Sequence, residues 1–381
     1  MTIEIERDAL LAALRQVADV VEARNTIPVL GNLLLVAGSG SLTVTGTDLD
    51  IEASATVPAA GEIETTIDAR KLVAAVASLK PGRLTIGAAA DRSAAVAIKS
   101  GRSTRTLGTL PGQDFPKRKP PEAACAFSMQ SAVLARMLGA CHVAQSTDET
   151  RYYLNGVYLH LVDGHLVATA TDAIKLVSAK TAAPEGCDRM AQVIVPSKAV
   201  GLLRKLLAKA PGTIDLLVSE NAVQASTGNV RLTFKTVDGT FPDYRRVIPM
   251  DTPGAHRIML WRDALIEAVN GVTSITDAEG ERKSRRVLLQ LTDGAETHML
   301  SARDTTGSSG NDEIEATVEG GDTVLELDQR FLLSAAGVFA EGAELTLHFI
   351  GESPVPVRLT SDKDPDLVAV IQSIGVPGGK S

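Results

Sequence analysis

The sequence predicts an α+β fold in which one domain, with two helices packed on antiparallel sheets, is repeated three times. The main observation is a strand-like run that ends in an aspartate at nearly equal intervals, as TGTD at Asp48, TATD at Asp172 and, more loosely, SARD at Asp304. A second landmark, a loop that ends in Phe-Pro, keeps the same interval at 115–116 and 241–242. Such regular self-similarity indicates an array, and its long period indicates whole domains rather than stacked hairpins.

The length of the chain agrees with three domains. A chain of 381 residues exceeds what one hydrophobic core usually supports, whereas one third of it is an ordinary domain size. Prolines interrupt both the helical and the strand periodicity at 117–122 (KRKPPE) and at 249–254 (PMDTPG). We therefore expect domains at 1–120, 121–253 and 254–381.

The same order of elements is expected in each repeat. An amphipathic helix opens the repeat, strands follow, a second helix comes next, and further strands close it. The expected helices are 7–21, 69–79, 130–144, 197–209, 261–272 and 328–340. Alternation of β-branched or aromatic residues marks the strands, as in 42–45 (LTVT), and turns such as 162–165 (VDGH) join them as hairpins. The sheets should therefore be largely antiparallel.

The net charge of −8 by itself disfavours binding to nucleic acid, because a polyanion attracts a basic surface. The distribution of charge argues otherwise. At about 100° per residue, three lysines of one expected helix share a side: Lys198, Lys205 and Lys209. Basic residues also lie on or beside other helices: Arg70, Lys71, Arg136 and Arg330. A solvated helix face is the ordinary interpretation of such a stripe, but its recurrence favours a surface that binds a polyanion.

Signatures of enzymes and metal sites are weak. Asp48 and Asp50 form a D-x-D that could hold magnesium, yet it occurs in one repeat only and fits a turn. Cys141 and His142 are neighbours on a helix and point about 100° apart, which does not suit a nucleophile and its base. The sequence has no phosphate-binding loop and no zinc-protease or hydrolase motif. We expect no catalytic residue, no metal and no cofactor.

The sequence also predicts a location. Three cysteines without a C-x-x-C spacing support neither a disulfide framework nor a zinc site. The N-terminus lacks the blocks of a signal peptide, and no apolar run approaches the length that spans a membrane. We expect a cytoplasmic protein with no membrane partner.

Four segments resemble the beta sliding clamp of bacterial DNA polymerase III: 27–34 (IPVLGNLL), 150–157 (TRYYLNGV), 193–196 (VIVP) and 238–247 (DGTFPDYRRV). The resemblance covers the first two domains at nearly full length and thins through the third. It implies a head-to-tail homodimer of three-domain chains, closed into a ring with helices lining the hole and continuous sheet outside. It also implies a processivity factor that encircles duplex DNA and tethers the polymerase, without a catalytic site of its own.

The resemblance and the basic helices together indicate which residues meet DNA. The candidates are Arg24, Arg70, Lys71, Arg136, Arg151, Tyr152, Tyr153, Lys198, Lys205 and Lys209. A ring need not read bases, so a few mobile cations facing phosphates are sufficient. The two tyrosines could stack on single-stranded template, and packing beneath a loop is an equally good interpretation of them. The implied partners are double-stranded DNA, the polymerase III catalytic subunit, the clamp loader and other proteins with a clamp-binding motif.

The resemblance further implies a pocket for a short linear peptide. The matching residues are Leu154, Thr171, Ile174, Lys175, Leu176, Pro242, Arg246, Val247, Ile371 and Ile374. Apolar residues with a basic rim suit an anchoring Leu or Phe with an acidic or polar flank. Where the family usually has TDGHRL, this chain has TDAIKL at 171–176, which replaces a planar bidentate donor with a point charge. Where the family usually ends in a tail like MPMRL, this chain ends VIQSIGVPGGKS, in which Ile371, Ile374 and Val376 could rebuild the wall of the pocket.

Two other interpretations stay open. A divergent accessory clamp with restricted partners fits these departures and a third one at 281–289 (ERKSRRVLL), where the family has a turn and strand like NEKFRGVRL. A protein-only scaffold of the same fold would be favoured if the basic helix faces were buried in ion pairs or turned outward. In the ring, the edge near 102–110 should meet the third domain of a second copy, with Arg105 where the family often has an aromatic residue.

Overall fold

The computed structural model describes residues 2–22, 26–90, 94–122, 124–208, 210, 212–278 and 285–375. The chain divides into two compact units. Unit 1 combines Met1–Ala135 with Pro184–Val237, and unit 2 combines Arg136–Ala183 with Asp238–Ser381. Each unit thus joins one part of the middle third of the sequence to one terminal third.

Unit 1 is built around a thirteen-stranded sheet in the order β10-β15-β16-β17-β4-β3-β2-β6-β9-β8-β7-β1-β5. Its strands are β1 (Thr2–Glu6), β2 (Asn32–Gly38), β3 (Ser41–Thr47), β4 (Ile51–Pro58), β5 (Ala60–Gly61), β6 (Ile63–Asp68), β7 (Arg83–Ala88), β8 (Ala95–Ser100), β9 (Ser103–Leu110), β10 (Cys125–Gln130), β15 (Thr213–Val218), β16 (Ala222–Thr227) and β17 (Val230–Lys235). Unit 1 also holds β14 (Val193–Pro196) and the 3₁₀ turns η1 (Pro28–Gly31) and η2 (Gly112–Asp114). Buried and more exposed residues alternate along β3 and β4, so one face of the sheet covers the core.

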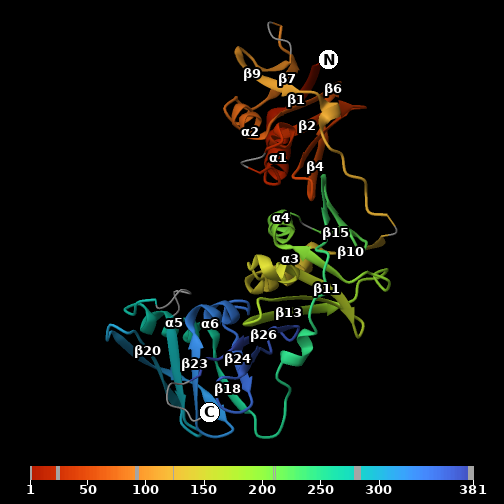
Figure 1. Cartoon of the computed structure of the whole chain (residues 1–381). Helices are drawn as coiled ribbons and strands as arrows, with labels where there is room; N and C mark the ends of the chain where they lie inside the picture. The colour runs from red at the N-terminus through yellow and green to blue at the C-terminus, as the bar shows by residue number, and fades with distance from the viewer. Residues whose placement is uncertain are drawn as a thin grey trace. The chain divides into compact units, whose positions relative to one another are not determined.

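Amphipathic helices supply the other layer of unit 1. Helices α1 (Arg7–Ala18) and α2 (Ala69–Ala77) lie side by side on the sheet (Figure 1). Their buried faces include Leu10, Leu14 and Val17 of α1 and Leu72 and Val76 of α2. Helix α4 (Ser197–Leu207) buries its own apolar side in the same way. Hydrophobic residues at helical spacing therefore fix which side of each helix remains outside.

Strand pairing makes the sheet of unit 1 continuous across the expected boundary near residue 120. Strand β4 pairs antiparallel with β17, from Ile51 opposite Phe234 to Ala55 opposite Val230. Phe234 has no exposed surface. An edge strand leaves backbone N–H and C=O groups without partners, and the pairing of β4 with β17 satisfies them. The middle third of the sequence is thus joined to the first third by backbone hydrogen bonds.

Unit 2 repeats this construction. One sheet runs β11-β12-β13-β26-β25-β24-β18-β22, and a four-stranded sheet runs β21-β20-β19-β23. The strands are β11 (Gly156–Val162), β12 (His165–Thr171), β13 (Lys175–Ala182), β18 (His256–Trp261), β19 (Arg286–Leu291), β20 (Thr297–Arg303), β21 (Ser309–Glu315), β22 (Thr317–Glu319), β23 (Thr323–Asp328), β24 (Glu344–Phe349), β25 (Pro356–Thr360) and β26 (Leu367–Gln372). Helices α5 (Arg262–Thr273) and α6 (Gln329–Ala336) lie side by side in this unit (Figure 1), and α3 (Ser131–Cys141) crosses the boundary between the units. Strand β13 pairs with β26, from Lys175 opposite Ile371 to Ala179 opposite Leu367.

The three repeated aspartates close equivalent hairpins. Each carboxylate accepts two backbone N–H groups of the turn that follows it, at 2.6 to 3.0 Å: Asp48 from Asp50 and Ile51, Asp172 from Ile174 and Lys175, and Asp304 from Thr306 and Ser308. A further N–H, that of Asp277, is the strongest influence that holds the pKa of Asp304 well below its usual range. The repeated motif is therefore a structural turn, and this includes the D-x-D at Asp48 and Asp50.

Helix ends differ in detail from the expectation. Helix α1 stops at Ala18 and continues as turns, α3 gives way at His142 to the 3₁₀ turn η3 (His142–Ala144), and α6 stops at Ala336 instead of 340. Gly337 is the C-cap of α6 and donates its N–H to the Leu333 carbonyl at 2.9 Å. The mixture of helices and antiparallel sheets is confirmed, while the division into three domains stays a prediction.

Ala173 provides a test of the turn after Asp172. Its φ is +75°, a conformation that costs a residue with a Cβ about 1 kcal/mol. We expect Ala173→Gly to raise the free energy of unfolding by about 0.5 to 1 kcal/mol, measured by denaturant titration. Ala222→Gly, at an ordinary extended position in β16, serves as the matched control and should lower it. Destabilisation by both substitutions would show that the turn at Ala173 carries no strain.

Candidate nucleic-acid interface and peptide site

Helix α4 presents the predicted basic stripe on its outer side. Lys198 and Lys205 lie opposite the buried Val200, Leu203 and Leu207. The side chain of Lys205 is 68% exposed and that of Lys198 is 39% exposed. Lys209 lies outside the described residues, as does Arg24. The described part of the stripe therefore faces outward, as its helical spacing predicts.

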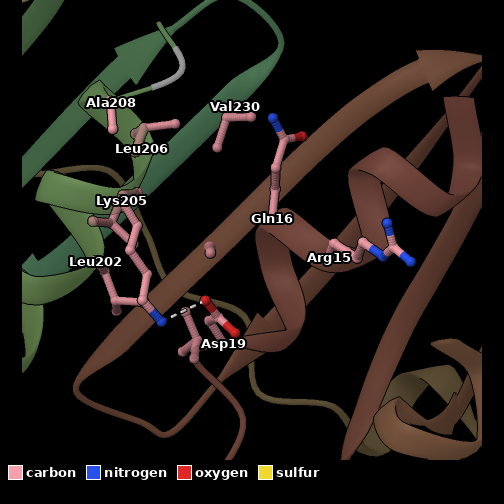
Figure 2. Close-up of a pocket in the computed structure, with 11 residues that line it drawn as sticks. Arg15, Gln16, Asp19, Leu202, Lys205, Leu206, Ala208 and Val230 are labelled. Carbon is pink, nitrogen blue, oxygen red and sulfur yellow. Dashed lines mark hydrogen bonds and ion pairs between the residues drawn. The ribbon is translucent and has the colours of Figure 1, made fainter.

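Both lysines are held by acids from the first third of the chain. Lys198 Nζ lies 2.5 Å from Asp48 Oδ2 and 3.1 Å from Glu22 Oε1. Lys205 Nζ lies 2.8 Å from Asp19 Oδ2, across the space between α4 and the end of α1 (Figure 2). Partial burial alone would lower the pKa of Lys198, but the hydrogen bonds to Asp48 and Glu22 outweigh it and raise that pKa. Lys198 is therefore an ammonium ion at neutral pH.

The Lys205–Asp19 pair lies at the edge of a cavity of about 430 Å³. Its apolar lining includes Val20, Leu202 and Leu206, and its polar lining includes Arg15 and Gln16 of α1. Figure 2 shows that Lys205 reaches toward Asp19, whereas Arg15 extends away from this pair. The acids that meet the stripe were not expected from the sequence, because they lie more than a hundred positions away from the lysines. The repeat pattern in the sequence does not predict contacts between α4 and acids of the first third.

The other predicted cations occupy two settings. Arg70 and Lys71 are exposed in the first turn of α2 in unit 1, where Asp68 caps the helix by accepting the Lys71 N–H at 2.8 Å. Arg136 of unit 2 donates to Asp364 Oδ1 at 2.8 Å. All three are exposed, and Arg136 holds one carboxylate.

The Arg151-Tyr152-Tyr153 segment belongs to the 3₁₀ helix η4 (Glu149–Leu154) of unit 2. Arg151 Nε lies 2.9 Å from Asp148 Oδ2. The Tyr152 ring is 53% exposed and meets the Tyr153 ring edge to face, with 5.9 Å between centroids. Tyr153 packs on Gly239, where an added Cβ would lie 2.9 Å from its own Cβ. Tyr152 thus has the exposure that stacking on a base requires, and Tyr153 supports it.

Several peptide-site residues meet at the β12-β13 turn in unit 2. Thr171 and Leu176 are buried there, and Ile174 and Lys175 are partly exposed. Leu154 is buried at the end of η4. Lys175 Nζ lies 2.6 Å from Asp172 Oδ2 and 5.1 Å from the centre of the Phe331 ring. The sequence did not point to Phe331, which lies on α6 far along the chain. The lysine charge is therefore already shared between a carboxylate and an aromatic face.

A second group of peptide-site residues lies on and just before η5 (Tyr244–Val247). Pro242, Arg246 and Val247 are exposed, and Val247 has 52% of its surface free. Arg246 Nε lies 3.0 Å from Asp243 Oδ2. This arrangement is an apolar rim with a basic side chain, as the resemblance implies.

An aromatic stack not singled out from the sequence supports η5 from below. The His160 ring stacks on Tyr158 with 4.2 Å between centroids, and Phe241 covers the Tyr158 ring at 4.7 Å. His160 Nε2 lies 3.1 Å from the Tyr244 hydroxyl. Burial, helped by the charge of Arg245, lowers the pKa of His160 to about 4, so the ring is neutral at pH 7. The uncharged rings of this stack therefore pack beneath η5 and support its exposed residues.

The C-terminal residues of the predicted pocket have different positions. Ile371 has no exposed surface and lies opposite Lys175 in the β13-β26 ladder. Ile374 donates its N–H to the Glu326 carbonyl at 2.7 Å and is partly exposed. Val376 lies outside the described residues. Ile371 is thus buried beside Lys175, Ile374 is partly exposed beside Glu326, and their part in the peptide site stays a prediction.

The groups that could bind a metal or act in catalysis are described next. Among the residues that the structure describes, no group of three or more His, Cys, Asp or Glu side chains could hold a metal ion. Burial raises the pKa of the Cys141 thiol to about 12, and His142 Nδ1 lies 2.6 Å from the Gly139 carbonyl. A thiol with that pKa is a poor nucleophile. No described helix is long and apolar enough to cross a membrane.

Two family models match most of the chain. The model for the N-terminal domain of the DNA polymerase III beta subunit matches residues 1–119, and the model for its central domain matches residues 128–243. The beta sliding clamp of Caulobacter vibrioides is 35% identical over 384 aligned residues, covering 99% of this chain and 100% of the relative. The beta sliding clamp of Pseudomonas aeruginosa is 33% identical, covering 93% of this chain and 94% of the relative.

Solved structures agree with these relatives. The DnaN sliding clamp of Bartonella birtlesii, bound to griselimycin, has a TM-score of 0.90 and 32% identity, covering 99% of this chain and 100% of that one. The sliding clamp of Caulobacter crescentus also has a TM-score of 0.90, with 34% identity and the same coverage. Fold, repeats and outward lysines thus define a DNA sliding clamp. The chain belongs to the family of DNA polymerase III beta subunits, the beta sliding clamps.

Proposed function

We propose that two copies of this chain close head to tail into a ring around duplex DNA, which tethers the polymerase III catalytic subunit and other proteins through the peptide site of unit 2. The role is topological and needs no catalytic group. The observation that supports it most is the pattern of strand edges. Equivalent edges of the repeats are paired at two places and left open at a third.

The two pairings within the chain follow one rule. Strands β4, β13 and β21 are the counterparts that follow the repeated aspartate turns. Strand β4 pairs with β17, and β13 pairs with β26. Strand β21 pairs only with β20 in the described part of the chain. Strand β9 is the first-repeat counterpart of β17 and β26, and its residues 103–108 pair only with β8 among the described strands. Open edges pair readily, so β21 of one copy is expected to take β9 of another.

The repeat also supplies the register. Asp48 N–H bonds the Ile51 carbonyl, and Asp304 N–H bonds the Ser308 carbonyl, so Ser308 is the counterpart of Ile51. Ile51 faces Phe234 across its ladder, and the counterpart of Phe234 in β9 is Leu107. Ser308 of one copy should therefore face Leu107 of the other. In an antiparallel ladder this register places Glu313 opposite Arg102 and sets Asp312 diagonally across from Arg105.

This register predicts a charge-swap result. Arg102→Glu or Glu313→Arg alone places like charges opposite each other at both interfaces, and should weaken the dimer roughly tenfold or more. The combined variant restores opposite charges and should recover most of the affinity. Sedimentation or light scattering at low micromolar concentration measures the dissociation constant.

Glu341→Arg, a reversal at an exposed site away from both edges, is the matched control and should leave the dimer intact. If the wild-type protein is only monomeric at this concentration, the proposal of a stable ring is wrong. A dimer that the double variant fails to restore would show that the register is wrong.

For DNA contact, we infer that the cations face phosphates while the acidic remainder of the surface limits indiscriminate binding. Lys198, Lys205, Arg70 and Lys71 are at the surface of unit 1. Tyr152 is the exposed ring that could meet a base. Arg24 and Lys209 remain candidates from the sequence. The ion pairs of Lys198 and Lys205 do not bury these lysines, so the pairs do not by themselves favour a protein-only scaffold.

Removal of the two lysine charges should weaken DNA binding. We expect Lys198→Gln with Lys205→Gln to reduce loading onto closed circular DNA and to flatten the salt dependence of binding to duplex DNA by about two phosphate contacts. Glutamine avoids the repulsion that glutamate would meet beside Asp48 and Glu22. Lys180→Gln, an exposed lysine of β13, is the control. Loading and retention equal to wild type would exclude α4 from the DNA interface.

For partner binding, we infer a restricted set of linear peptides. Leu154 and Leu176 form an apolar floor and Val247 an exposed rim. Lys175 offers a point charge that Asp172 already engages, where an arginine would add a bidentate donor. Residues 370–376 (VIQSIGV) also differ from the MPMRL-like segment that the family usually has. This is the observation behind the interpretation as a divergent accessory clamp.

A consensus clamp-binding peptide should therefore bind roughly tenfold more weakly to this protein than to the Caulobacter clamp, because each departure is worth on the order of 1 kcal/mol. Fluorescence anisotropy measures both affinities. Lys175→Arg should recover part of the difference, whereas Lys180→Arg on the same strand should not. Equal affinity for the two clamps would mean that the C-terminal residues rebuild the wall, and the restricted set would be abandoned.

A further inference from the structure

The two lysines of α4 that are proposed to face DNA are already occupied by carboxylates of their own chain. Lys198 contacts Asp48 and Glu22, and Lys205 contacts Asp19. The ammonium-to-carboxylate distances, 2.5 to 3.1 Å, are those of charge-assisted hydrogen bonds to an anionic oxygen. A DNA phosphate would have to replace these oxygens.

Asp19 lies where the helix itself disfavours it. It is the C-cap of α1, where the helix macrodipole is negative and a carboxylate is locally unfavourable. Its side chain is about half exposed, at 48%, and it makes no capping hydrogen bond through that side chain in the structure. The local fold therefore does not account for an acid at this position. The contact with Lys205 does.

Asp48 divides its two oxygens between two roles. Oδ1 accepts the N–H groups of the turn, and Oδ2 accepts from Lys198. The Asp48 side chain is only 7% exposed, so its position is fixed by the hairpin. Glu22, by contrast, is exposed and reaches the same ammonium from the segment that follows α1. One carboxylate is thus built into the fold, and the other two are adjustable.

We propose that Asp19, Glu22 and Asp48 act as internal substitutes for phosphate, which hold Lys198 and Lys205 in ion pairs that DNA must displace. This inference rests on the proposed DNA contact of these two lysines. Its effect is to weaken the hold of the clamp on any one phosphate. A ring retained by its topology gains mobility from a weak hold and loses nothing in retention.

The inference predicts that neutralising the acids strengthens DNA binding. Asp19→Asn and Glu22→Gln should each tighten the binding of a short labelled duplex about threefold to tenfold at low salt. The slope of log affinity against log salt concentration should stay close to that of the wild type, because the same two lysines neutralise phosphates in both proteins. Asp48 is left unchanged, because the hairpin needs it.

Three matched variants make the result specific. Glu62→Gln removes the same charge from an exposed acid of unit 1 that contacts neither lysine, and should leave the affinity nearly unchanged. Lys205→Gln should weaken binding. Asp19→Asn added to Lys205→Gln should give no gain, because the lysine that it would release is absent. Anisotropy at several salt concentrations gives both affinity and slope.

The outcomes separate the two ideas. If the lysine variants weaken binding but the acid variants match Glu62→Gln, the phosphate-substitute role is overturned and the DNA contact stands. If the acid variants only lower the melting temperature and leave binding unchanged, the ion pairs merely join α4 to α1 and the inference is again overturned. If neither the lysine variants nor the acid variants change DNA binding, both the proposed DNA contact of α4 and the phosphate-substitute role are overturned.

Discussion

The architecture depends on one interaction, the antiparallel pairing of an edge strand from one repeat with an edge strand from the next. The β4-β17 and β13-β26 ladders bind the thirds of the sequence together through backbone hydrogen bonds. Side chains at these ladders, such as Phe234 and Ile371, have no exposed surface. These ladders join the repeats through the backbone, and the polar side of α4 adds the ion pairs of Lys198 and Lys205 with acids of the first third.

Much of this could be predicted from the sequence because it depends on local patterns. Helical spacing located all six helices to within a few residues, and the repeated aspartates pointed to equivalent hairpins. The side of α4 that carries Lys198 and Lys205 followed from the same spacing. What escaped prediction depends on contacts between distant segments. Asp19 beside Lys205, Phe331 beside Lys175 and Tyr244 beside His160 leave no periodic trace in the sequence.

In the candidate sites, too, local patterns could be predicted from the sequence and contacts between distant segments could not. Leu154 and Leu176 were placed in the peptide site by resemblance; the structure shows that both are buried, Leu176 after the β12-β13 turn and Leu154 at the end of η4. Ile371 was placed in the wall, and this stays a prediction: it is buried and lies directly opposite Lys175 in the ladder, so the two side chains share one face of the sheet. The pairing of β13 with β26 brings these two residues together, and no pattern within either strand reveals that pairing.

The charges on the two open edges also govern which assemblies are avoided. An unpaired strand can pair with any other, including the same strand of a second copy. In a two-fold antiparallel pairing of two β9 edges with Arg102 opposite Arg105, like charges would meet, and two β21 edges with Asp312 opposite Glu313 would meet in the same way. Such symmetric pairings are penalised by like charges, whereas the proposed pairing of β9 with β21 brings unlike charges together. The charges on the edges therefore disfavour isologous dimers relative to the head-to-tail pairing before any DNA is present.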